Sequence, residues 1–282
     1  MFQMSIGIIG NGFVGEAIRE NLKKHYDVLA YDTDPKKTDC HSISVLTSQC
    51  KFIFVSVPTP MFLDGSPDLS IIFDVMDNIS KDYNDNIIIL KSTVIPGTSR
   101  QIKRRHPELK IVFSPEFLTE ANSVKDFKDC NRAIFGGQKK DTHQCVQMMQ
   151  KVFPAKQYVK TDWETAETVK YFINTFLATK VSFANEMKQL CDSAGTDYSS
   201  VVELALLDDR IGKSHLQAPG PDGYHGFGGK CFAKDLNALI HFCVSRKVKP
   251  TLLQAAWLKN LEVREEKDWL NIKGAVTKGD KK

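Results

Sequence analysis

The N-terminal half of the sequence alternates short apolar runs with longer amphipathic stretches, and this alternation restricts the fold more than any other feature. The runs are almost continuously hydrophobic, as expected of strands that helices cover on both faces. They span residues 5–9, 27–31, 51–57, 86–90, 109–113 and 132–136. Stretches between them, such as 16–25 and 69–81, have the character of helices. This order predicts an α/β domain with a doubly wound, Rossmann-like parallel sheet and right-handed crossovers.

Near residue 158 the pattern changes to helices. Residues 164–194 contain neither Pro nor Gly, and 198–206, 234–246 and 251–269 also have helical patterns, whereas 217–229 is a loop rich in Gly and Pro. The 282 residues fit two domains of roughly 150 residues each. We expect an α/β domain over 1–162, an all-helical domain over 163–270 and a polar tail over 271–282.

Composition excludes several classes of protein. The net charge of +4 is too small to indicate a nucleic-acid partner. No apolar run approaches the roughly 20 residues of a membrane helix, and no basic leader of a signal peptide precedes the first run. The seven cysteines include no Cys-x-x-Cys pair, which argues against a disulfide framework or a zinc site. We expect a cytoplasmic protein without a structural metal.

The first motif is a glycine-rich turn at the end of the first apolar run. Gly10, Gly12 and Gly15 have G-x-G-x-x-G spacing, which allows a tight turn, close approach to a pyrophosphate and close packing of the following helix. Asp32 ends the second run, about twenty residues on, where a carboxylate accepts ribose hydroxyls and repels a 2′-phosphate. The motif predicts NAD binding, although Lys36 and Lys37 leave NADP open. Further candidate contacts to the cofactor are Phe13, Val14 and Lys37.

The second motif places a cysteine at the start of a helix. Three glycines, at 226, 228 and 229, precede Cys231 and should let a substrate come close to the thiol. Lys230 and Lys234 flank Cys231. Positive charge at a helix N-terminus stabilises a thiolate. Asp235 lies four residues on and therefore on the same helix face. A thiol and a carboxylate so arranged indicate covalent catalysis with an assisting base, although a free cysteine is more often a small buried apolar residue.

Other polar residues follow predicted strands or share a helix face. Lys170 and Asn174 are four residues apart on the long helix and could together stabilise an alkoxide, although a solvated helix face is the commoner reason for such spacing. The carboxyl ends of parallel strands line the ligand crevice of such sheets. Residues at these ends are Pro58, Thr59, Ser92, Thr93, Glu116 and Glu120.

Together these segments resemble the nucleotide-sugar dehydrogenase family, the UDP-glucose/GDP-mannose dehydrogenases. The resemblance runs through most of the chain in the same order, and its most specific part is the segment 226–235, Gly-Phe-Gly-Gly-Lys-Cys-Phe-Ala-Lys-Asp. It implies oxidation of a sugar CH₂OH group to a carboxylate with two NAD⁺, for which UDP-glucose is the default substrate and UDP-N-acetylhexosamines or GDP-mannose are alternatives.

The resemblance also implies roles for individual residues. Cys231 would form a thiohemiacetal and then a thioester. Lys170, Asn174 and Asp235 would manage the alkoxide proton, Thr93, Glu120 and Asp235 would place the hydrolytic water, and Glu116 would be a further acid/base or polar contact. Residues implied at the cofactor are Pro58, Thr59, Thr93, Glu120 and Lys234. Residues implied at the sugar nucleotide are Phe117, Leu118, Phe227, Gly228 and Phe232.

By the same resemblance, Arg210 reaches a substrate bound to a partner subunit, which implies a homodimer formed through the helical domain. Family members usually continue into a third, Rossmann-like domain, and no second G-x-G-x-x-G follows residue 250 here. We therefore expect the nucleotide end of the substrate to lack its usual walls.

Two alternatives to this function stay open. One is a truncated, catalytically weak relative that binds NAD and acts with a partner. The other is a two-electron β-hydroxyacid dehydrogenase, which would use a helix lysine without a catalytic cysteine. The number of NADH molecules formed per substrate distinguishes them.

Overall fold

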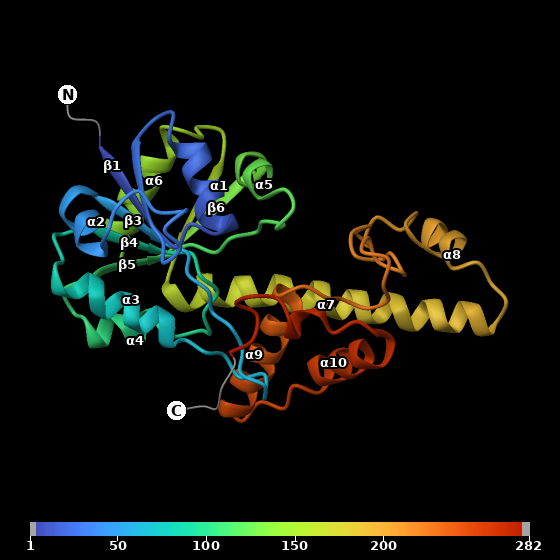
Figure 1. Ribbon diagram of the computed structural model, residues 1–282. Helices are drawn as coiled ribbons and strands as arrows, with labels where there is room; N and C mark the ends of the chain where they lie inside the picture. The colour runs from blue at the N-terminus through green and yellow to red at the C-terminus, as the bar shows by residue number, and fades with distance from the viewer. Residues whose placement is uncertain (1–3, 278–282) are drawn as a thin grey trace. The chain divides into compact units, whose positions relative to one another are not determined.

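The computed structural model describes residues 4–277, and the chain divides into two compact units (Figure 1). The sheet unit comprises Met1–Thr59 and Asp68–Lys170. The helical unit comprises Pro60–Pro67 and Tyr171–Lys282. The short segment 60–67 therefore leaves the sheet unit after a strand and belongs to the helical unit.

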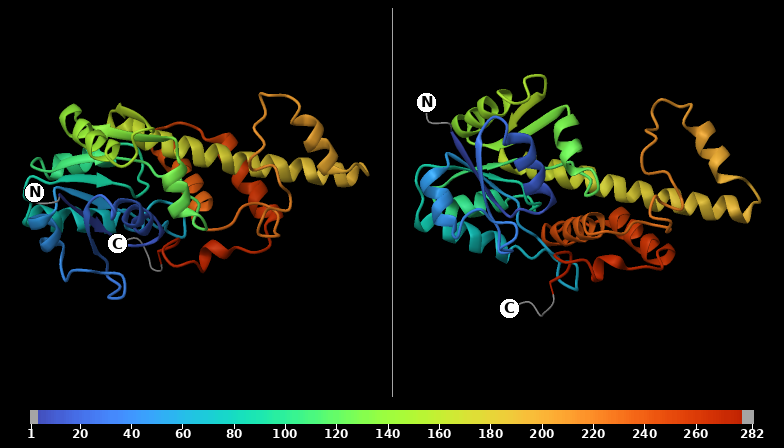
Figure 2. Two further views of the ribbon diagram at one scale, coloured as in Figure 1. Left: turned by 90° about the horizontal axis from the view of Figure 1, so that it is seen from above. Right: turned by 45° about the horizontal axis from the view of Figure 1, so that its top comes forward.

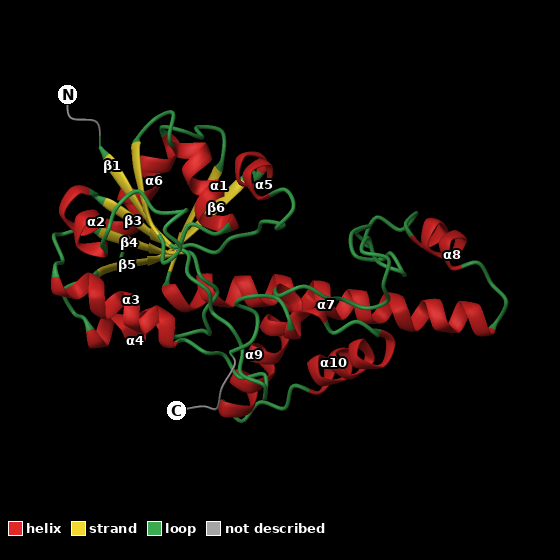
Figure 3. Ribbon diagram, viewed as in Figure 1, coloured by secondary structure: helices red, strands yellow, loops and turns green. Residues whose placement is uncertain are grey.

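The sheet unit contains a seven-stranded sheet with the order β2-β1-β3-β4-β5-β6-β7. Figure 3 shows its strands in yellow among the helices of this unit. Its first five strands pair in parallel: β1 (Ser5–Ile9), β2 (Asp27–Tyr31), β3 (Phe52–Val55), β4 (Ile87–Leu90) and β5 (Lys110–Phe113). The strand order reverses between β1 and β3, which is the switch point where doubly wound sheets bind ligands. The predicted α/β, Rossmann-like architecture is confirmed.

Helices cover both faces of this sheet, so alternate residues of one strand face different cores. Phe54 and Ile89 pack beneath α1 (Phe13–Leu22), α5 (Ser123–Asp129) and α6 (Lys139–Gln150). Val55 and Leu90 face α2 (Ile43–Gln49), α3 (Ser70–Lys81), α4 (Thr98–Arg105) and the start of α7 (Trp163–Ser193). Every residue of β3 and β4 is consequently buried, which explains their continuous apolar runs.

The expectation that all strands are parallel is wrong at one position. Strand β6 (Arg132–Gly137) runs antiparallel to β5, and β7 (Gln157–Thr161), which was not predicted, pairs with β6 in parallel. Between β5 and β6, α5 packs on α1, where Asn21 Nδ2 donates to the Val124 carbonyl at 3.0 Å. Strand β6 therefore begins at the end of the sheet where β5 finishes, which makes it antiparallel to β5.

The helical unit is built around the rest of α7. In both views of Figure 2, α9 (Cys231–Ser245) and α10 (Thr251–Val263) lie beside this helix. They share a core that includes Val181, Leu236 and Ala256. Near the end of α7, Tyr198 of α8 (Tyr198–Ala205) packs beside Cys191. The helix expected over 251–269 ends at Val263, and a separate 3₁₀ turn follows at Asp268–Leu270.

Part of the predicted polar tail is packed against the helical unit. Ala275 is fully buried, and its carbonyl accepts a hydrogen bond from the Met61 N–H at 2.9 Å. The Thr277 N–H donates to the Met61 carbonyl at 2.8 Å. Residues 278–282, the rest of that tail, lie outside the described residues. Within residues 4–277, no helix has the length and apolar character to cross a membrane.

Candidate active site

The glycine-rich turn after β1 requires its three glycines for different reasons. Gly10 has φ of +87°, and a Cβ there would lie 2.8 Å from the Ser56 carbonyl oxygen. A Cβ at Gly15 would overlap the Gly10 carbonyl oxygen, so glycine lets α1 pack against the turn. A Cβ at Gly12 would meet nothing within 4 Å. The turn therefore has open space at the glycine that should face a pyrophosphate.

Asp32, at the end of β2, is hydrogen-bonded to this turn. Its Oδ2 accepts from the Asn11 N–H at 2.7 Å, and its Oδ1 accepts from the Asp34 N–H at 2.8 Å. Asn11 Nδ2 donates to the Lys37 carbonyl at 2.9 Å, whereas the buried Asn11 Oδ1 has no hydrogen-bond partner among the described residues. Asp32 is half-buried and lies at the switch point, the position of a ribose-binding carboxylate.

Five further cofactor candidates of the sheet unit lie at the same edge of the sheet. Loops after β3 and β4 meet there, since Ser92 Oγ donates to the Val57 carbonyl at 2.7 Å. The first turn of α1 presents backbone N–H groups of the kind that bind phosphate. The candidates placed by these elements are Phe13, Val14, Pro58, Thr59 and Thr93. With the glycine turn and Asp32, these residues bring together the backbone N–H groups and the carboxylate that dinucleotide sites use.

Glu116, in the loop after β5, forms a buried ion pair with Lys170. Lys170 Nζ donates to Glu116 Oε1 at 2.7 Å and to the Glu116 carbonyl at 2.8 Å, and both side chains are more than 90% buried. Glu116 Oε2 accepts from the Leu118 N–H at 2.8 Å. Glu120, four residues further on, is exposed. The sequence indicated Glu116 and Lys170 separately but not their pairing.

Lys91 is a second buried lysine beside this pair, and sequence reasoning assigned it no role. Its Nζ donates to Ser114 Oγ at 3.3 Å and to the Pro115 carbonyl at 3.1 Å. Burial lowers the pKa of Lys91 to about 8, against the opposing attraction of the Glu116 carboxylate. Together with Glu116, Lys91 lines a cavity that also contacts Phe117, Leu118 and Arg132.

In the helical unit, α9 begins at Cys231, so the half-buried thiol lies in the first turn of the helix, as predicted. One turn later, Asp235 is 1% exposed. Asn174 Nδ2 donates to Asp235 Oδ2 at 2.6 Å, and the Lys234 ammonium binds the other carboxylate oxygen. Lys234, which we expected at the cofactor phosphates, is thus paired with Asp235 here. The helix N-terminus supplies partial positive charge near the thiol.

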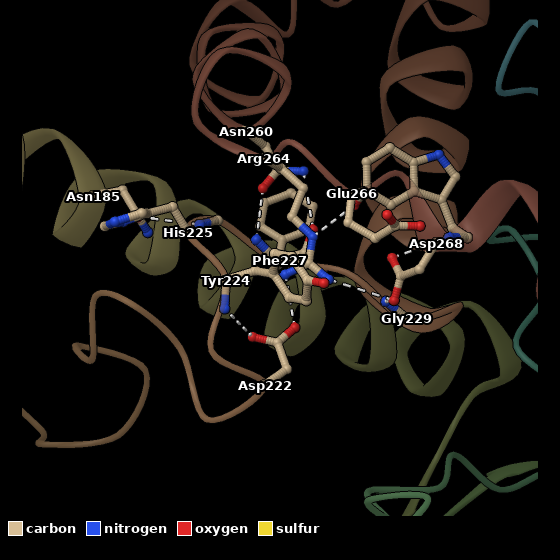
Figure 4. Close-up of polar contacts among 12 residues, drawn as sticks. Asn185, Asp222, Tyr224, His225, Phe227, Gly229, Asn260, Arg264, Glu266 and Asp268 are labelled. Atoms are coloured by element: carbon tan, nitrogen blue, oxygen red, sulfur yellow. Dashed lines mark hydrogen bonds and ion pairs between the residues drawn. The ribbon is translucent and has the colours of Figure 1, made fainter.

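A set of contacts from α10 and the segment after it holds the loop before Cys231 (Figure 4). Asn260 Oδ1 accepts from the Phe227 N–H at 2.6 Å, and Asn260 Nδ2 donates to the Phe227 carbonyl at 3.1 Å. Asp268 Oδ2 accepts from the Gly229 N–H at 3.0 Å. Arg264 Nη1 donates to Asp222 Oδ2 at 2.7 Å.

These contacts change the interpretation of the glycines in this loop. We predicted that they let a substrate approach. A Cβ at Gly226 would instead overlap Asn260 Oδ1, and a Cβ at Gly228 would overlap the Arg264 guanidinium. A Cβ at Gly229, which has φ of +68°, would meet nothing within 4 Å. Packing against α10 therefore accounts for Gly226 and Gly228.

Three predicted substrate contacts differ in their environments. Phe227 is 4% exposed and belongs to the core of the helical unit, with its ring 6.2 Å from that of Trp257. This placement does not support contact with substrate. Phe232 is half-buried and packs edge-on against Phe227 at 5.9 Å. The Arg210 side chain is 88% exposed and pairs with Asp208 in its own loop.

Sequence reasoning missed Asn260, Arg264 and Asp268. The signal that could have found two of them is their spacing, because Asn260 and Arg264 are four residues apart and therefore on one helix face. Both are nearly fully buried. An arginine is rarely buried unless it is paired with a carboxylate. Nothing in the sequence connects them to a loop more than thirty residues earlier.

The doubly wound sheet and its glycine turn define a dinucleotide-binding protein of the dehydrogenase class. Residues 38–156 match the NAD binding domain of the UDP-glucose/GDP-mannose dehydrogenase family, and residues 164–261 match its central domain. The chain belongs to this family, and its cofactor is NAD.

Named relatives are similar over much of this chain. The UDP-glucose 6-dehydrogenase of Rickettsia bellii is 36% identical over 220 residues, which cover 74% of this chain and 49% of that protein. UDP-glucose 6-dehydrogenase TuaD of Bacillus subtilis is 32% identical, over 79% of this chain and 49% of that protein. The chain thus spans about half the length of these curated relatives.

A solved structure has the same fold over most of this chain. The UDP-glucose dehydrogenase from the hyperthermophilic archaeon Pyrobaculum islandicum superposes with a TM-score of 0.82 at 26% identity. The match covers 92% of this chain and 68% of that one.

Proposed function

We propose that this chain oxidises the C6 alcohol of a nucleotide sugar to the carboxylate, with conversion of UDP-glucose to UDP-glucuronate as the first candidate reaction. The observation that carries the proposal is the cluster at the start of α9, where Cys231 precedes a buried Asp235 held by Asn174 and Lys234. Oxidation to a ketone or aldehyde needs no nucleophile. A thiol at this position suits a further oxidation through a thioester.

In each of two oxidations, bound NAD⁺ would accept a hydride from C6 of the sugar. The turn of Gly10, Gly12 and Gly15 would hold its pyrophosphate, and Asp32 its ribose hydroxyls. Thr59 and Thr93 lie at the same sheet edge and would contact its remaining part.

The first oxidation needs a group that stabilises an alkoxide and a group that takes its proton. The Lys170 ammonium and the Asn174 amide would donate hydrogen bonds to the alkoxide. A water held by the Asp235 carboxylate would take the proton. Both Lys170 and Asn174 come from α7, one helical turn apart.

Cys231 would then attack the C6 aldehyde as a thiolate. A C–S bond forms, the carbonyl oxygen becomes a hydroxyl, and loss of a proton and the second hydride leaves a thioester. Water placed by Thr93, Glu120 and Asp235 would attack this thioester, so that the C–S bond breaks and Cys231 leaves as a thiolate. Glu116 would be a further acid/base group. One sugar alcohol, two NAD⁺ and one water thereby yield a carboxylate, two NADH and three protons.

We also propose that the enzyme is a homodimer formed through the helical unit. Four apolar side chains on α7 are each more than half exposed: Phe172, Phe176, Phe183 and Leu190. Their spacing of four or seven residues places them on one face of the helix, which would be an unusual exposed patch for a monomer. The exposed Arg210 would reach a substrate on the partner.

A reducing, cytoplasmic location would suit this mechanism. All seven cysteines are free thiols in the structure, and the proposed nucleophile must stay reduced.

Replacement of the proposed nucleophile tests the function. We expect Cys231→Ser to lose formation of UDP-glucuronate, because a serine hydroxyl is a poorer nucleophile and leaving group than a thiolate in these reaction steps. NAD⁺ binding, measured by calorimetry, should be retained. Cys243→Ser is the matched control, since Cys243 is a half-buried thiol on the same helix. An unchanged rate of acid formation in Cys231→Ser contradicts the proposal.

A further inference from the structure

Asn260 of α10 holds the loop before Cys231 by its backbone. It is fully buried, and both polar atoms of its amide bond to the N–H and the carbonyl of Phe227. An amide that pairs with both backbone groups of one residue fixes the direction of the chain there. The same oxygen lies 2.4 Å from the position of a Cβ at Gly226, so the loop has no room for a side chain there.

Arg264, which directly follows the last residue of α10, holds the loop at a second point. Its side chain is 1% exposed. Its Nη1 donates to Asp222 Oδ2 at 2.7 Å, its Nε donates to the Glu266 carbonyl at 2.8 Å, and its Nη2 lies 3.5 Å from Asp268 Oδ2. The Tyr224 ring lies 4.9 Å from the guanidinium carbon. A buried guanidinium with this many partners is costly to disturb, because loss of one partner leaves charge unpaired.

Asp268 connects this arginine to the residues just before the thiol. Its Oδ2 accepts a hydrogen bond from the Gly229 N–H and forms an ion pair with Arg264 Nη2. Gly229 is two residues before Cys231. Burial by itself would raise the pKa of Asp222, but the Arg264 guanidinium and the Tyr224 N–H bring it below its ordinary value. The loop is therefore held at Asp222, Phe227 and Gly229 by one face of α10 and the turn that follows it (Figure 4).

We propose that Asn260 and Arg264 are positioning residues for Cys231: by fixing loop 222–229, they set where the thiol lies at the start of α9. The geometry belongs to the helical unit alone, while the catalytic consequence rests on the proposed function. Misplacement of a reacting group by about 1 Å can cost roughly a hundredfold in rate. Neither side chain needs to touch the substrate for this effect.

The test compares Arg264→Gln, Arg264→Lys and Asn260→Asp with two control variants of exposed residues in the same unit, Arg246→Gln and Asn271→Asp. Two quantities are measured in each protein. The first is kcat and KM for UDP-glucose oxidation. The second is the pH dependence of alkylation by iodoacetamide at Cys231 and at Cys243, resolved by peptide mass spectrometry.

Positioning predicts a selective effect. Arg264→Gln and Asn260→Asp lower kcat at least about tenfold, with little change in KM for NAD⁺, because the thiol is displaced while the sheet unit is intact. They change the alkylation profile of Cys231 but leave that of Cys243 as in the wild type. Arg264→Lys recovers part of kcat, since it restores a cation between Asp222 and Asp268.

The proposal is overturned if Cys231 alkylation and kcat in these variants match the two controls. It is also overturned if both cysteines become more reactive in parallel, which would show general loss of folding. If Arg264→Gln does not fold, Arg264→Lys and Asn260→Asp decide by the same readouts. If the wild type makes no acid, the proposed function fails, and the alkylation comparison alone decides whether the loop contacts position Cys231.

Discussion

At the scale of single residues, the candidate site contains two buried side-chain pairs, Lys170 with Glu116 and Asn174 with Asp235. The glycine turn, Asp32 and the position of Cys231 at the start of a helix follow from residues near one another in the chain. The pairing of Lys170 with Glu116 joins residues 54 positions apart, and that of Asn174 with Asp235 joins residues 61 positions apart. Spacing cannot select such partners, because the selection depends on which loops the fold brings together.

Two glycines of the same turn should respond differently to alanine. Gly15→Ala should destabilise the sheet unit by about 1–3 kcal/mol, because the added Cβ overlaps the Gly10 carbonyl oxygen. Gly12→Ala should leave stability within about 0.5 kcal/mol, since its Cβ meets nothing and its φ of −78° suits alanine.

Gly12→Ala, which should leave stability almost unchanged, should nevertheless affect cofactor affinity. Gly12→Ala should weaken NAD⁺ binding, measured by calorimetry, because its Cβ occupies the space proposed for the pyrophosphate. Wild-type affinity in Gly12→Ala would contradict the assignment of this turn to the cofactor.

At the scale of elements, long periodic helices and continuously apolar strands were predictable, and a strand without an apolar run was not. Helix α7, expected over 164–194, spans Trp163–Ser193. By contrast, β7 escaped prediction because three of its five residues are exposed, and it carries no continuous apolar run. The residues of β6 predict a strand but do not show that it runs antiparallel to β5.

Helix α4 is an element stabilised by a residue from elsewhere. Its N-cap, Gly97, offers no side chain, and the Glu167 carboxylate of α7 accepts instead from the Gly97 N–H at 2.6 Å and the Ser99 N–H at 2.8 Å. Burial raises the pKa of Glu167 to about 7, although these hydrogen bonds oppose the rise. Between about pH 4.5 and 7 the folded state therefore holds a proton that the unfolded state has lost.

This linkage predicts a pH-dependent difference between the wild type and Glu167→Gln. The contribution of Glu167 to the free energy of unfolding should fall as pH rises from about 4.5 to 7, because folding then opposes ionisation. Glu167→Gln removes that fall, so its stability relative to wild type should increase from pH 5 to pH 8 by about 1–3 kcal/mol. Urea denaturation followed by circular dichroism measures it. Glu203→Gln, an exposed control, should show no such trend.

At the scale of the whole molecule, the sequence predicted both the α/β unit and the helical region, and the family comparisons support them. It did not predict that segment 60–67 leaves the sheet unit to pair with residues 275–277 of the helical unit. This association of segment 60–67 with the helical unit includes backbone hydrogen bonds at Met61, which belongs to no recognisable motif. The chain spans about half the length of its named relatives, so its activity has to be measured on this chain itself.

The proposed dimer leads to a prediction about the exposed face of α7. Phe172 and Phe176 stack with ring centroids 6.4 Å apart while each is more than 60% exposed. Replacing both with Gln should shift the protein from dimer to monomer in sedimentation velocity, without loss of helical signal. Leu258→Gln, at a similarly exposed apolar residue on α10, is the control. A wild-type monomer at all concentrations, or a double variant that stays dimeric, would rule out this face.

The most direct measurement is the number of NADH molecules released per nucleotide sugar consumed. Purified protein is incubated with limiting UDP-glucose and excess NAD⁺, NADH is followed by absorbance, and the sugar product is quantified by mass spectrometry. Oxidation through a Cys231 thioester predicts two NADH and one carboxylate per sugar. One NADH with an aldehyde or ketone product, or NAD⁺ binding with no turnover of any UDP or GDP sugar, would contradict it.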